Sequence, residues 1–255
     1  MSIYITGDIH GDPERFSSSI FPEGKNLKRD DVVEILGDFG LVWDYQGESD
    51  QETYWLDWLE KKPWTTVATL GNHENYDRIE KLPVEERFGG PVWVVRPHVL
   101  LLQSGYIYEI SGKKIWNFNG AASHDISDGI IDGADPDWRK RAREWDRFGK
   151  WFRVKGVSWW PQEVESNESV YERGISNLEV VDYDVDFVWT HCAPTEIVRL
   201  MRHYSNDRLT DYLQRIDDEF KNRNRDPYWF FGHYHDNRTP DHHKYLLYEQ
   251  IVQIA

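Results

Sequence analysis

The sequence has few of the features that mark secreted or membrane proteins. Its 255 residues include one cysteine, Cys192, so no internal disulfide can form and a reducing, cytoplasmic setting is expected. The longest apolar runs, such as VVEIL and YWFF, are far shorter than the roughly 20 residues that cross a bilayer, so no membrane association is expected. The N-terminal MSIYITGDIHGD lacks the basic and apolar segments of a secretory signal, and none is expected.

The chain also lacks an excess of basic residues. Its 30 Lys and Arg residues face 45 Asp and Glu residues, which gives a net charge of −15. Because nucleic acids are attracted to basic surfaces, a long nucleic acid is not expected as a partner. The charge is uneven, since residues 139–155 hold eight basic and two acidic residues.

Short β-type runs alternate with helix-like stretches along the chain. The runs IYIT, VVEIL, VATL, KIWNFN, DFVWT and YWFF are rich in the residues that favour buried strands. Between them, residues 50–62 place apolar side chains at helical spacing. This alternation predicts an α/β fold, most simply one domain over 1–255. Residues 92–119 and the C-terminal 244–255 resemble hairpins, so a mixed sheet is expected.

One stretch departs from this alternation. About sixty residues separate the run that ends near Ala122 from the run that ends at His191. A crossover between parallel strands needs only a dozen or more residues. Part of 123–180, which contains the basic segment, is therefore predicted to be an insertion or lid on the core.

Side chains able to bind metals follow five of the β-type runs. They occur in GDIHG, GDFG, GNHE, after the run DFVWT, and in GHYH. Strand ends are where open α/β sheets gather functional side chains. Each cluster alone could be structural, as when an asparagine caps a helix, but five together predict a shared metal site. The residues are Asp8, His10, Asp38, Asn72, His73, His191, His233 and His235.

The order of these motifs resembles that of the calcineurin-like metallophosphoesterase superfamily, over residues 4 to about 236. The resemblance implies a four-layer α/β/β/α sandwich with a mixed sheet, to which the insertion would add a helical lid. It also implies two divalent metal ions at the strand ends. In that arrangement Asp8, His10 and His235 hold the first ion, Asn72, His191 and His233 hold the second, Asp38 bridges both, and His73 is catalytic.

The residue types agree with this assignment. A carboxylate can bridge two cations, and neutral imidazole suits manganese, iron or zinc. No cysteine belongs to the set, so ligation by nitrogen and oxygen to Mn²⁺, Fe or Zn²⁺ is expected, and the sequence does not choose among these metals. In this hypothesis a metal-bridging hydroxide attacks phosphorus, and protonated His73 acts as general acid toward the leaving oxygen.

The chain departs from the resembling serine/threonine phosphatases at Leu41 and Val42, where those enzymes carry an aspartate and an arginine. Asp44 is near enough in sequence to orient His73 instead, or else lies at the surface. The basic insertion is either an amphipathic helix whose aromatic residues pack on the core or a lid whose bases meet the substrate. The candidate substrate-binding residues are Asn119, His124, Arg143 and Arg147.

The sequence therefore predicts a metal-dependent phosphoester hydrolase. A phosphomonoesterase is expected first, with a serine/threonine-phosphatase-like enzyme as one form, acting on a phosphorylated small molecule or a phosphoprotein. The alternatives are a phosphodiesterase, a nuclease or a dinucleoside polyphosphate hydrolase. A non-catalytic scaffold is a further alternative, although all eight motif positions are filled. The natural substrate and the oligomeric state are left open.

Overall fold

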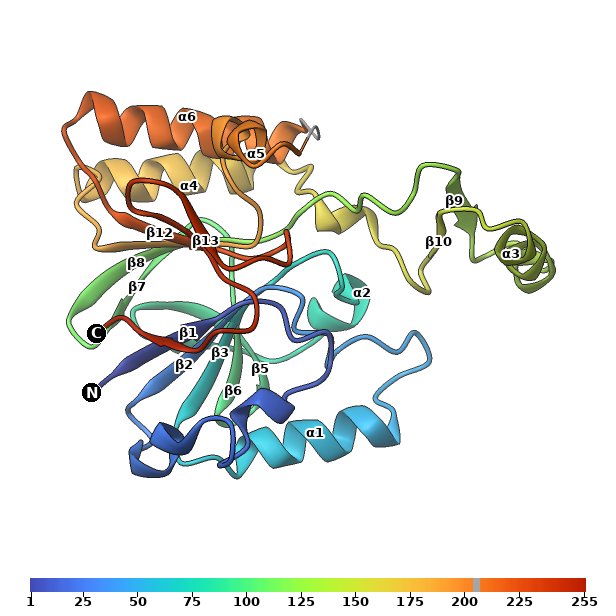
Figure 1. Ribbon diagram of the computed structural model, residues 1–255, viewed down its shortest axis with the longest axis horizontal. Coiled ribbons are helices and arrows are strands. Elements are labelled where there is room, and N and C mark those ends of the chain that lie inside the picture. The colour runs from blue at the N-terminus through green and yellow to red at the C-terminus, as the bar shows by residue number, and fades with distance from the viewer. Residues whose placement is uncertain (204–206) are drawn as a thin grey trace.

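Two mixed β-sheets packed against each other form the centre of the molecule (Figure 1). The computed structural model describes residues 1–203 and 207–255. The first sheet has the order β15 (Val252–Gln253), β1 (Ile3–Thr6), β2 (Val32–Leu36), β3 (Thr65–Thr69), β6 (Val99–Leu102), β5 (Gly90–Arg96) and β4 (Val84–Arg87). The second has the order β13 (Arg238–Asp241), β14 (Lys244–Leu246), β12 (Tyr228–Phe231), β11 (Phe187–Thr190), β8 (Lys113–Phe118) and β7 (Tyr106–Ile110).

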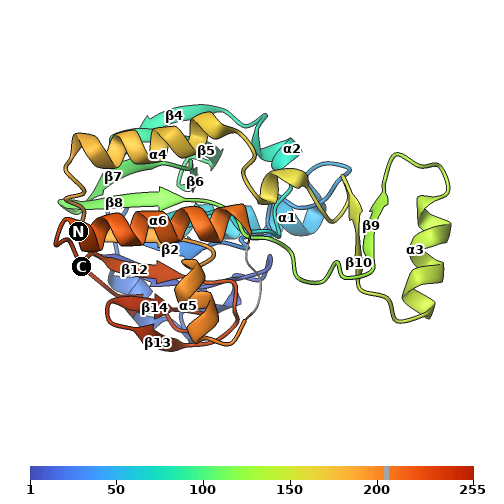
Figure 2. The same cartoon turned by 90° about the horizontal axis from the view of Figure 1, so that it is seen from above.

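Helices cover the outer faces of both sheets (Figures 1 and 2). Outside the second sheet lie α4 (Glu168–Val180), α5 (Thr195–Leu200) and α6 (Arg208–Asn222), and outside the first lies α1 (Asp50–Glu60). Apolar side chains of both sheets form a shared core between them. All five residues of β2 are buried, as expected for a strand covered on both faces. The predicted α/β class and mixed sheets are confirmed.

The helix predicted over 50–62 is confirmed as α1, which ends two residues earlier. Ser49 caps it, because its side chain accepts the Glu52 backbone N–H while the Glu52 carboxylate accepts that of Ser49. Within the described residues, no helix combines the length and apolar character needed to cross a bilayer. The shorter helical segments are α2 (Tyr76–Ile79) and three 3₁₀ turns, Glu14–Phe16, Pro22–Asn26 and Pro161–Glu163.

The hairpin structure predicted over 92–119 forms, and the hairpin predicted over 244–255 does not. β5 pairs with β6 and β7 with β8, both antiparallel. The prediction for residues 244–255 is wrong, because β14 runs parallel to β12 in the second sheet, whereas β15 pairs with β1 in the first. An apolar pattern indicates a strand but not its partner, and here each half finds a different sheet.

Residues 129–155, called the arm below, project from one end of the body (Figures 1 and 2). The arm contains β9 (Gly129–Asp132), α3 (Trp138–Arg147) and β10 (Phe152–Lys155), and its two strands run parallel. No residue of α3 is buried, and Phe148 and Trp151 are 80% and 59% exposed. The interpretation in which these aromatic residues pack on the core is therefore wrong.

The predicted insertion 123–180 contains two different kinds of structure. Its first part is the projecting arm, whereas its last part is α4, which packs beside β7. Tyr171 and Leu178 of α4 belong to the core outside the second sheet. The lid function of this stretch stays a prediction.

Candidate metal centre

The carboxyl ends of parallel strands from both sheets meet at the candidate metal centre. β1, β2 and β3 run parallel in the first sheet, and β11 and β12 run parallel in the second. All of the motif residues follow the ends of these strands. Asp8 and His10 follow β1, Asp38 follows β2, Asn72 and His73 follow β3, His191 follows β11, and His233 and His235 follow β12.

One group of side chains forms a compact cluster. Asp8, His10, Asp38 and His235 each offer a ligand atom, and these atoms lie within 4.8 Å of one another. The Nε2 atoms of His10 and His235 are 3.0 Å apart, and Nε2 of His235 is 3.1 Å from Oδ2 of Asp8. Imidazole nitrogens and carboxylate oxygens that converge in this way fit a divalent cation.

A second group lies on the other side of Asp38. Nε2 of His191 is 3.2 Å from Oδ1 of Asp38 and 3.3 Å from Oδ1 of Asn72. The rings of His191 and His233 have centroids 4.9 Å apart. Oδ2 of Asp38 is also 3.7 Å from Nδ1 of His10. Asp38 therefore contacts both groups, one with each carboxylate oxygen.

The backbone at the centre is strained. Four residues other than glycine have positive φ angles, namely His10 (45°), Asp38 (44°), His233 (70°) and His235 (48°). Such a conformation costs about 1–3 kcal/mol per residue and persists only where neighbouring contacts enforce it. Here the His10 N–H donates to the Asp38 carbonyl (2.8 Å), and the His233 N–H donates to the Asp8 carboxylate (3.0 Å).

Two glycines allow the strand ends to approach so closely. A Cβ atom at Gly37 would lie 2.0 Å from Nδ1 of His191, and one at Gly71 would lie 2.2 Å from Oδ1 of Asp38. Gly37 also has a φ of +90°, which disfavours other residues. Side chains at these positions would displace the ligand candidates themselves.

For most side chains of the centre, the electrostatics favour the protonation state that binds a cation. Burial lowers the pKa of His10 and His233, which keeps both imidazoles neutral. Burial would raise the pKa of Asp38, but the neighbouring histidines, His191 foremost, hold it well below its ordinary value. Burial also opposes charge on His191, yet Asp38 and Asp8 raise its pKa to about 9. Cation binding by His191 would therefore release a proton.

A family match extends these observations beyond the site to most of the chain. The model of the calcineurin-like phosphoesterase family matches residues 1–237. The chain belongs to the calcineurin-like phosphoesterase family. A search of curated proteins gave no match. Family membership implies a metal-dependent phosphoric ester hydrolase, and this phosphoesterase has a candidate metal-binding cluster of four residues.

His73 of the phosphoesterase lies at the edge of the centre and is held on several sides. Its backbone N–H donates to Oδ1 of Asp38 (2.8 Å), and its ring stacks on Trp43 at 5.4 Å between centroids. Nε2 of His73 accepts a hydrogen bond from Nη2 of Arg153 (2.7 Å). An arginine has donors only, so this nitrogen is unprotonated here. Burial, with Arg153 adding to it and Asp38 opposing, lowers the pKa of His73 to about 4.

The predicted orienting role of Asp44 is wrong. Within the described residues, its carboxylate accepts the backbone N–H of Gln46 (2.8 Å), which is a turn contact, whereas Trp43 and Arg153 hold the His73 ring. Sequence reasoning missed both of these partners. Trp43 lies beside Asp44, and Arg153 lies within the basic segment, but neither belongs to a motif that marks it as a site residue.

The four candidate substrate-binding residues have different environments. The Asn119 side chain accepts the Leu70 N–H (2.9 Å) and donates to the Leu102 carbonyl (2.7 Å), so it links strand ends and is not placed as a substrate ligand. His124 is exposed, and its ring lies 5.8 Å from that of His233, at the rim of the centre. Arg143 and Arg147 are exposed on α3, which lies at the outer end of the arm (Figure 2).

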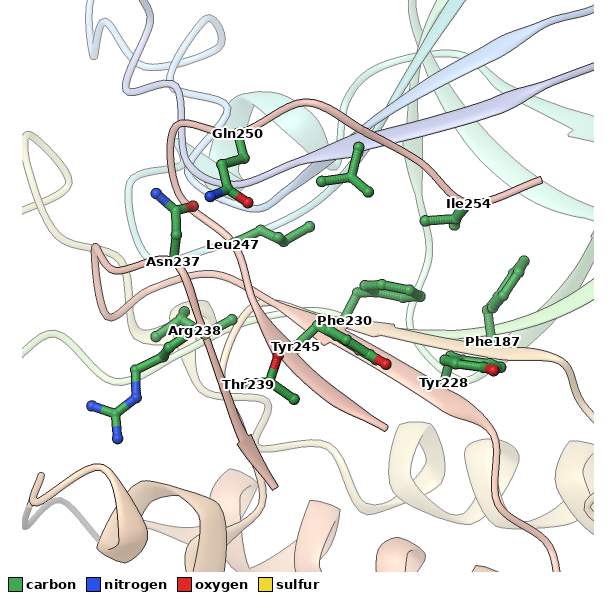
Figure 3. Close-up of a pocket in the computed structure, with 12 residues that line it drawn as sticks. Phe187, Tyr228, Phe230, Asn237, Arg238, Thr239, Tyr245, Leu247, Gln250 and Ile254 are labelled. Carbon is green, nitrogen blue, oxygen red and sulfur yellow. The ribbon is translucent and has the colours of Figure 1, made fainter. Parts of the chain in front are cut away.

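A separate cavity of about 530 Å³ lies beside the C-terminal strands (Figure 3). Aromatic side chains from the second sheet, including Phe230 and Tyr245, form one wall, and Ile254 lies on another side. None of the described residues that line it belongs to the metal centre. We therefore assign the chemistry to the strand ends rather than to this cavity.

Proposed function

We propose that the protein is a phosphomonoesterase that uses two divalent ions, drawn from manganese, iron and zinc. The observation that carries this proposal is the position of Asp38, whose two oxygens face different groups of ligand candidates. A carboxylate between two such groups is suited to bridge two cations. The proposed ligands are Asp8, His10 and His235 for one ion, Asn72, His191 and His233 for the other, and Asp38 for both.

When bound, such ions activate water and neutralise charge on a phosphoryl group. The chain's own contribution is the handling of the leaving group. His73 is the proposed general acid, because its Nε2 faces the centre and lies 4.0 Å from Oδ2 of Asp38. Proton donation from this nitrogen requires the hydrogen bond from Arg153 to open and Nε2 to take up a proton first. The stacked Trp43 ring keeps the imidazole plane in one orientation meanwhile.

The proposed substrate is a phosphorylated small molecule or a phosphoprotein. The net charge of −15 disfavours a long nucleic acid, whose phosphates the chain would repel. A second candidate is a phosphodiesterase or dinucleoside polyphosphate hydrolase. Exposed Phe148 and Trp151 beside basic residues favour it, because aromatic rings can stack on a nucleotide base. The single buried cysteine, Cys192, supports a cytoplasmic location.

Turnover of two model esters tests this proposal. Protein loaded with Mn²⁺, Fe²⁺ or Zn²⁺ is assayed with p-nitrophenyl phosphate and with bis-p-nitrophenyl phosphate, and Asp38→Asn serves as the inactive control. Faster turnover of the monoester supports a phosphomonoesterase. Preference for the diester supports the second candidate. Absence of turnover on both esters with every metal contradicts the proposal.

A further inference from the structure

Arg153 brings a buried positive charge from the arm to the edge of the metal centre. It lies on β10, at the base of the arm, and is 5% exposed. Its guanidinium Nη2 reaches Nε2 of His73 at 2.7 Å. The same histidine nitrogen lies 4.0 Å from Oδ2 of Asp38. A phosphoryl group bound at the centre would therefore lie within reach of this guanidinium.

The other contacts of Arg153 fix its position without occupying all of its donors. Its Nε lies 2.7 Å from Oδ1 of Asp125, and Nη1 donates to the carbonyls of Asn72 (3.3 Å) and Ser158 (3.5 Å). A guanidinium has five N–H groups. The hydrogen bonds to Asn72, Ser158 and His73 use three of them within the described part of the chain. At least one N–H on Nη2 stays available for a ligand.

The partner at Nη2 is one that a substrate can replace. A neutral imidazole is a weaker partner for a guanidinium than an anionic phosphate oxygen, because only the oxygen adds an opposite charge and allows bidentate pairing. The planar guanidinium also matches the geometry of phosphate oxygens better than a lysine ammonium does. Asp125 thus orients Arg153, and the Nη2 of Arg153 makes a replaceable hydrogen bond with His73 beside the metal centre.

We infer that Arg153 binds the phosphoryl group of the substrate and that Asp125 positions it. This inference rests on the proposed function and deepens it by naming the residue that recognises the phosphoryl group of the substrate. A phosphomonoester has three terminal oxygens, so one oxygen can face Arg153 while two face the metal side. A phosphodiester has only two terminal oxygens. The contact with Arg153 therefore favours monoesters, and the arm supplies this residue to a centre built by the body.

Steady-state kinetics and phosphate inhibition test the inference on the full-length, metal-loaded protein. Arg153→Ala is expected to lower kcat/KM for p-nitrophenyl phosphate by about 10²-fold. It is expected to raise the inhibition constant of inorganic phosphate about tenfold or more. Turnover of bis-p-nitrophenyl phosphate should fall much less. Asp125→Asn should raise the KM for p-nitrophenyl phosphate less than Arg153→Ala does. Added guanidinium ion should restore part of the activity of Arg153→Ala.

Matched variants separate this role from a general effect of charge or folding. Lys25→Gln with Lys28→Gln removes two exposed charges from the body and should leave all of these values unchanged. Bound metal, measured by elemental analysis, should stay the same in Arg153→Ala. If Arg153→Ala does not fold, Arg153→Lys decides, because it keeps the charge and loses the planar fork. Unchanged phosphate inhibition in whichever variant folds overturns the inference.

Phosphate binding separates failure of the inference from failure of the proposed function. Calorimetric titration of the metal-loaded wild type with inorganic phosphate needs no turnover. Weaker binding by the Arg153 variant supports the inference even if the wild type hydrolyses neither model ester, which would contradict the proposed function alone. Equal binding by wild type and variant overturns the inference even if the wild type is an active phosphatase.

Discussion

At the scale of single residues, His73 differs from its histidine neighbours. His10, His191, His233 and His235 lie among the proposed ligands, whereas the His73 ring lies between Trp43 and the Arg153 guanidinium. Its backbone, rather than its ring, binds Asp38 at short distance. These contacts suit a residue that would handle a proton next to the proposed ions without coordinating them.

Replacement of His73 by asparagine should therefore reduce turnover and spare metal binding. We expect kcat to fall about 10²–10⁴-fold for esters with poor leaving groups, because these need a proton on the departing oxygen. The loss should be smaller for p-nitrophenyl phosphate, whose leaving group needs less assistance. Elemental analysis and kinetics on phenyl and p-nitrophenyl phosphate check this. His242→Asn, at an exposed position, is the control, and full activity of the His73 variant on phenyl phosphate would contradict the assigned role.

Glu34 is a second residue with an unusual environment. It is fully buried on β2, and its Oε1 accepts hydrogen bonds from the backbone N–H (2.9 Å) and the hydroxyl (2.7 Å) of Thr69. Its other oxygen has no hydrogen-bond partner among the described residues. Burial, only partly offset by the Thr69 bonds, raises the pKa of Glu34 to about 8. The side chain is thus protonated at neutral pH in the folded protein.

This raised pKa predicts a pH dependence of stability. Between pH 4.5 and about 8 the folded state keeps a proton on Glu34 that the unfolded state releases, so stability falls as pH rises through this range. Glu34 contributes up to about 1.4 kcal/mol per pH unit to the slope of the free energy of unfolding against pH. Glu34→Gln should remove it, as measured by urea unfolding at several pH values. Glu179→Gln is an exposed control, and an unchanged slope in Glu34→Gln would show that Glu34 does not carry the proton.

At the scale of elements, α1 depends on its first turn. Glu52 completes the capping box with Ser49, and its carboxylate also accepts the Trp43 N–H (2.6 Å) and pairs with Arg78 (2.9 Å). The start of α1 is therefore connected to the loop whose tryptophan stacks on His73. A single acidic side chain links a helix terminus to the candidate site.

Loss of the cap should cost stability and little activity. Ser49→Ala removes the side-chain oxygen that accepts the Glu52 N–H, and we expect a loss of about 1 kcal/mol in the free energy of unfolding. Ser49→Thr keeps a hydroxyl and should lose much less. Thermal and urea unfolding of the two variants measure this difference. Equal stability of the alanine and threonine variants would mean that solvent replaces the cap at no cost.

At the scale of the whole molecule, the candidate centre joins the two sheets. Asp8, Asp38 and Asn72 come from the first sheet, whereas His191 and His233 come from the second. A cation held by both sets would link the two halves of the structure. Because ligands that bind the folded state stabilise it, ion binding and global stability should be coupled.

Metal removal should therefore lower the melting temperature. At an ion concentration of 100 times Kd the stabilisation is about 2.7 kcal/mol, or about 5–10 °C for a chain of this size. Scanning calorimetry before and after chelation, and after Mn²⁺ is restored, measures the shift. Asp38→Asn should show little response to Mn²⁺. A wild-type melting temperature that does not respond to any divalent ion would contradict a centre shared by the sheets.

Much of the site was predictable from the sequence because its signal is local. Each candidate ligand follows a short apolar run within a few residues, often beside a glycine, and parallel strands bring such ends to one edge. The helix at 50–62 was predictable for the same reason, since its cap and its apolar spacing lie within one segment. The sequence by itself thus determined the strand ends that carry the motifs, the helix at 50–62 and the family.

Only the tertiary structure decided which distant segments meet. It assigned β14 and β15 to different sheets, gave Asn119 a linking role, and brought Arg153 from the arm to His73, 80 positions earlier in the chain. Nothing in the residues around Arg153 distinguishes it from Arg143 or Arg147, because burial and charge pairing depend on the neighbours that folding supplies. A long-range contact is a property of the packed chain, whereas a motif is a property of its local order.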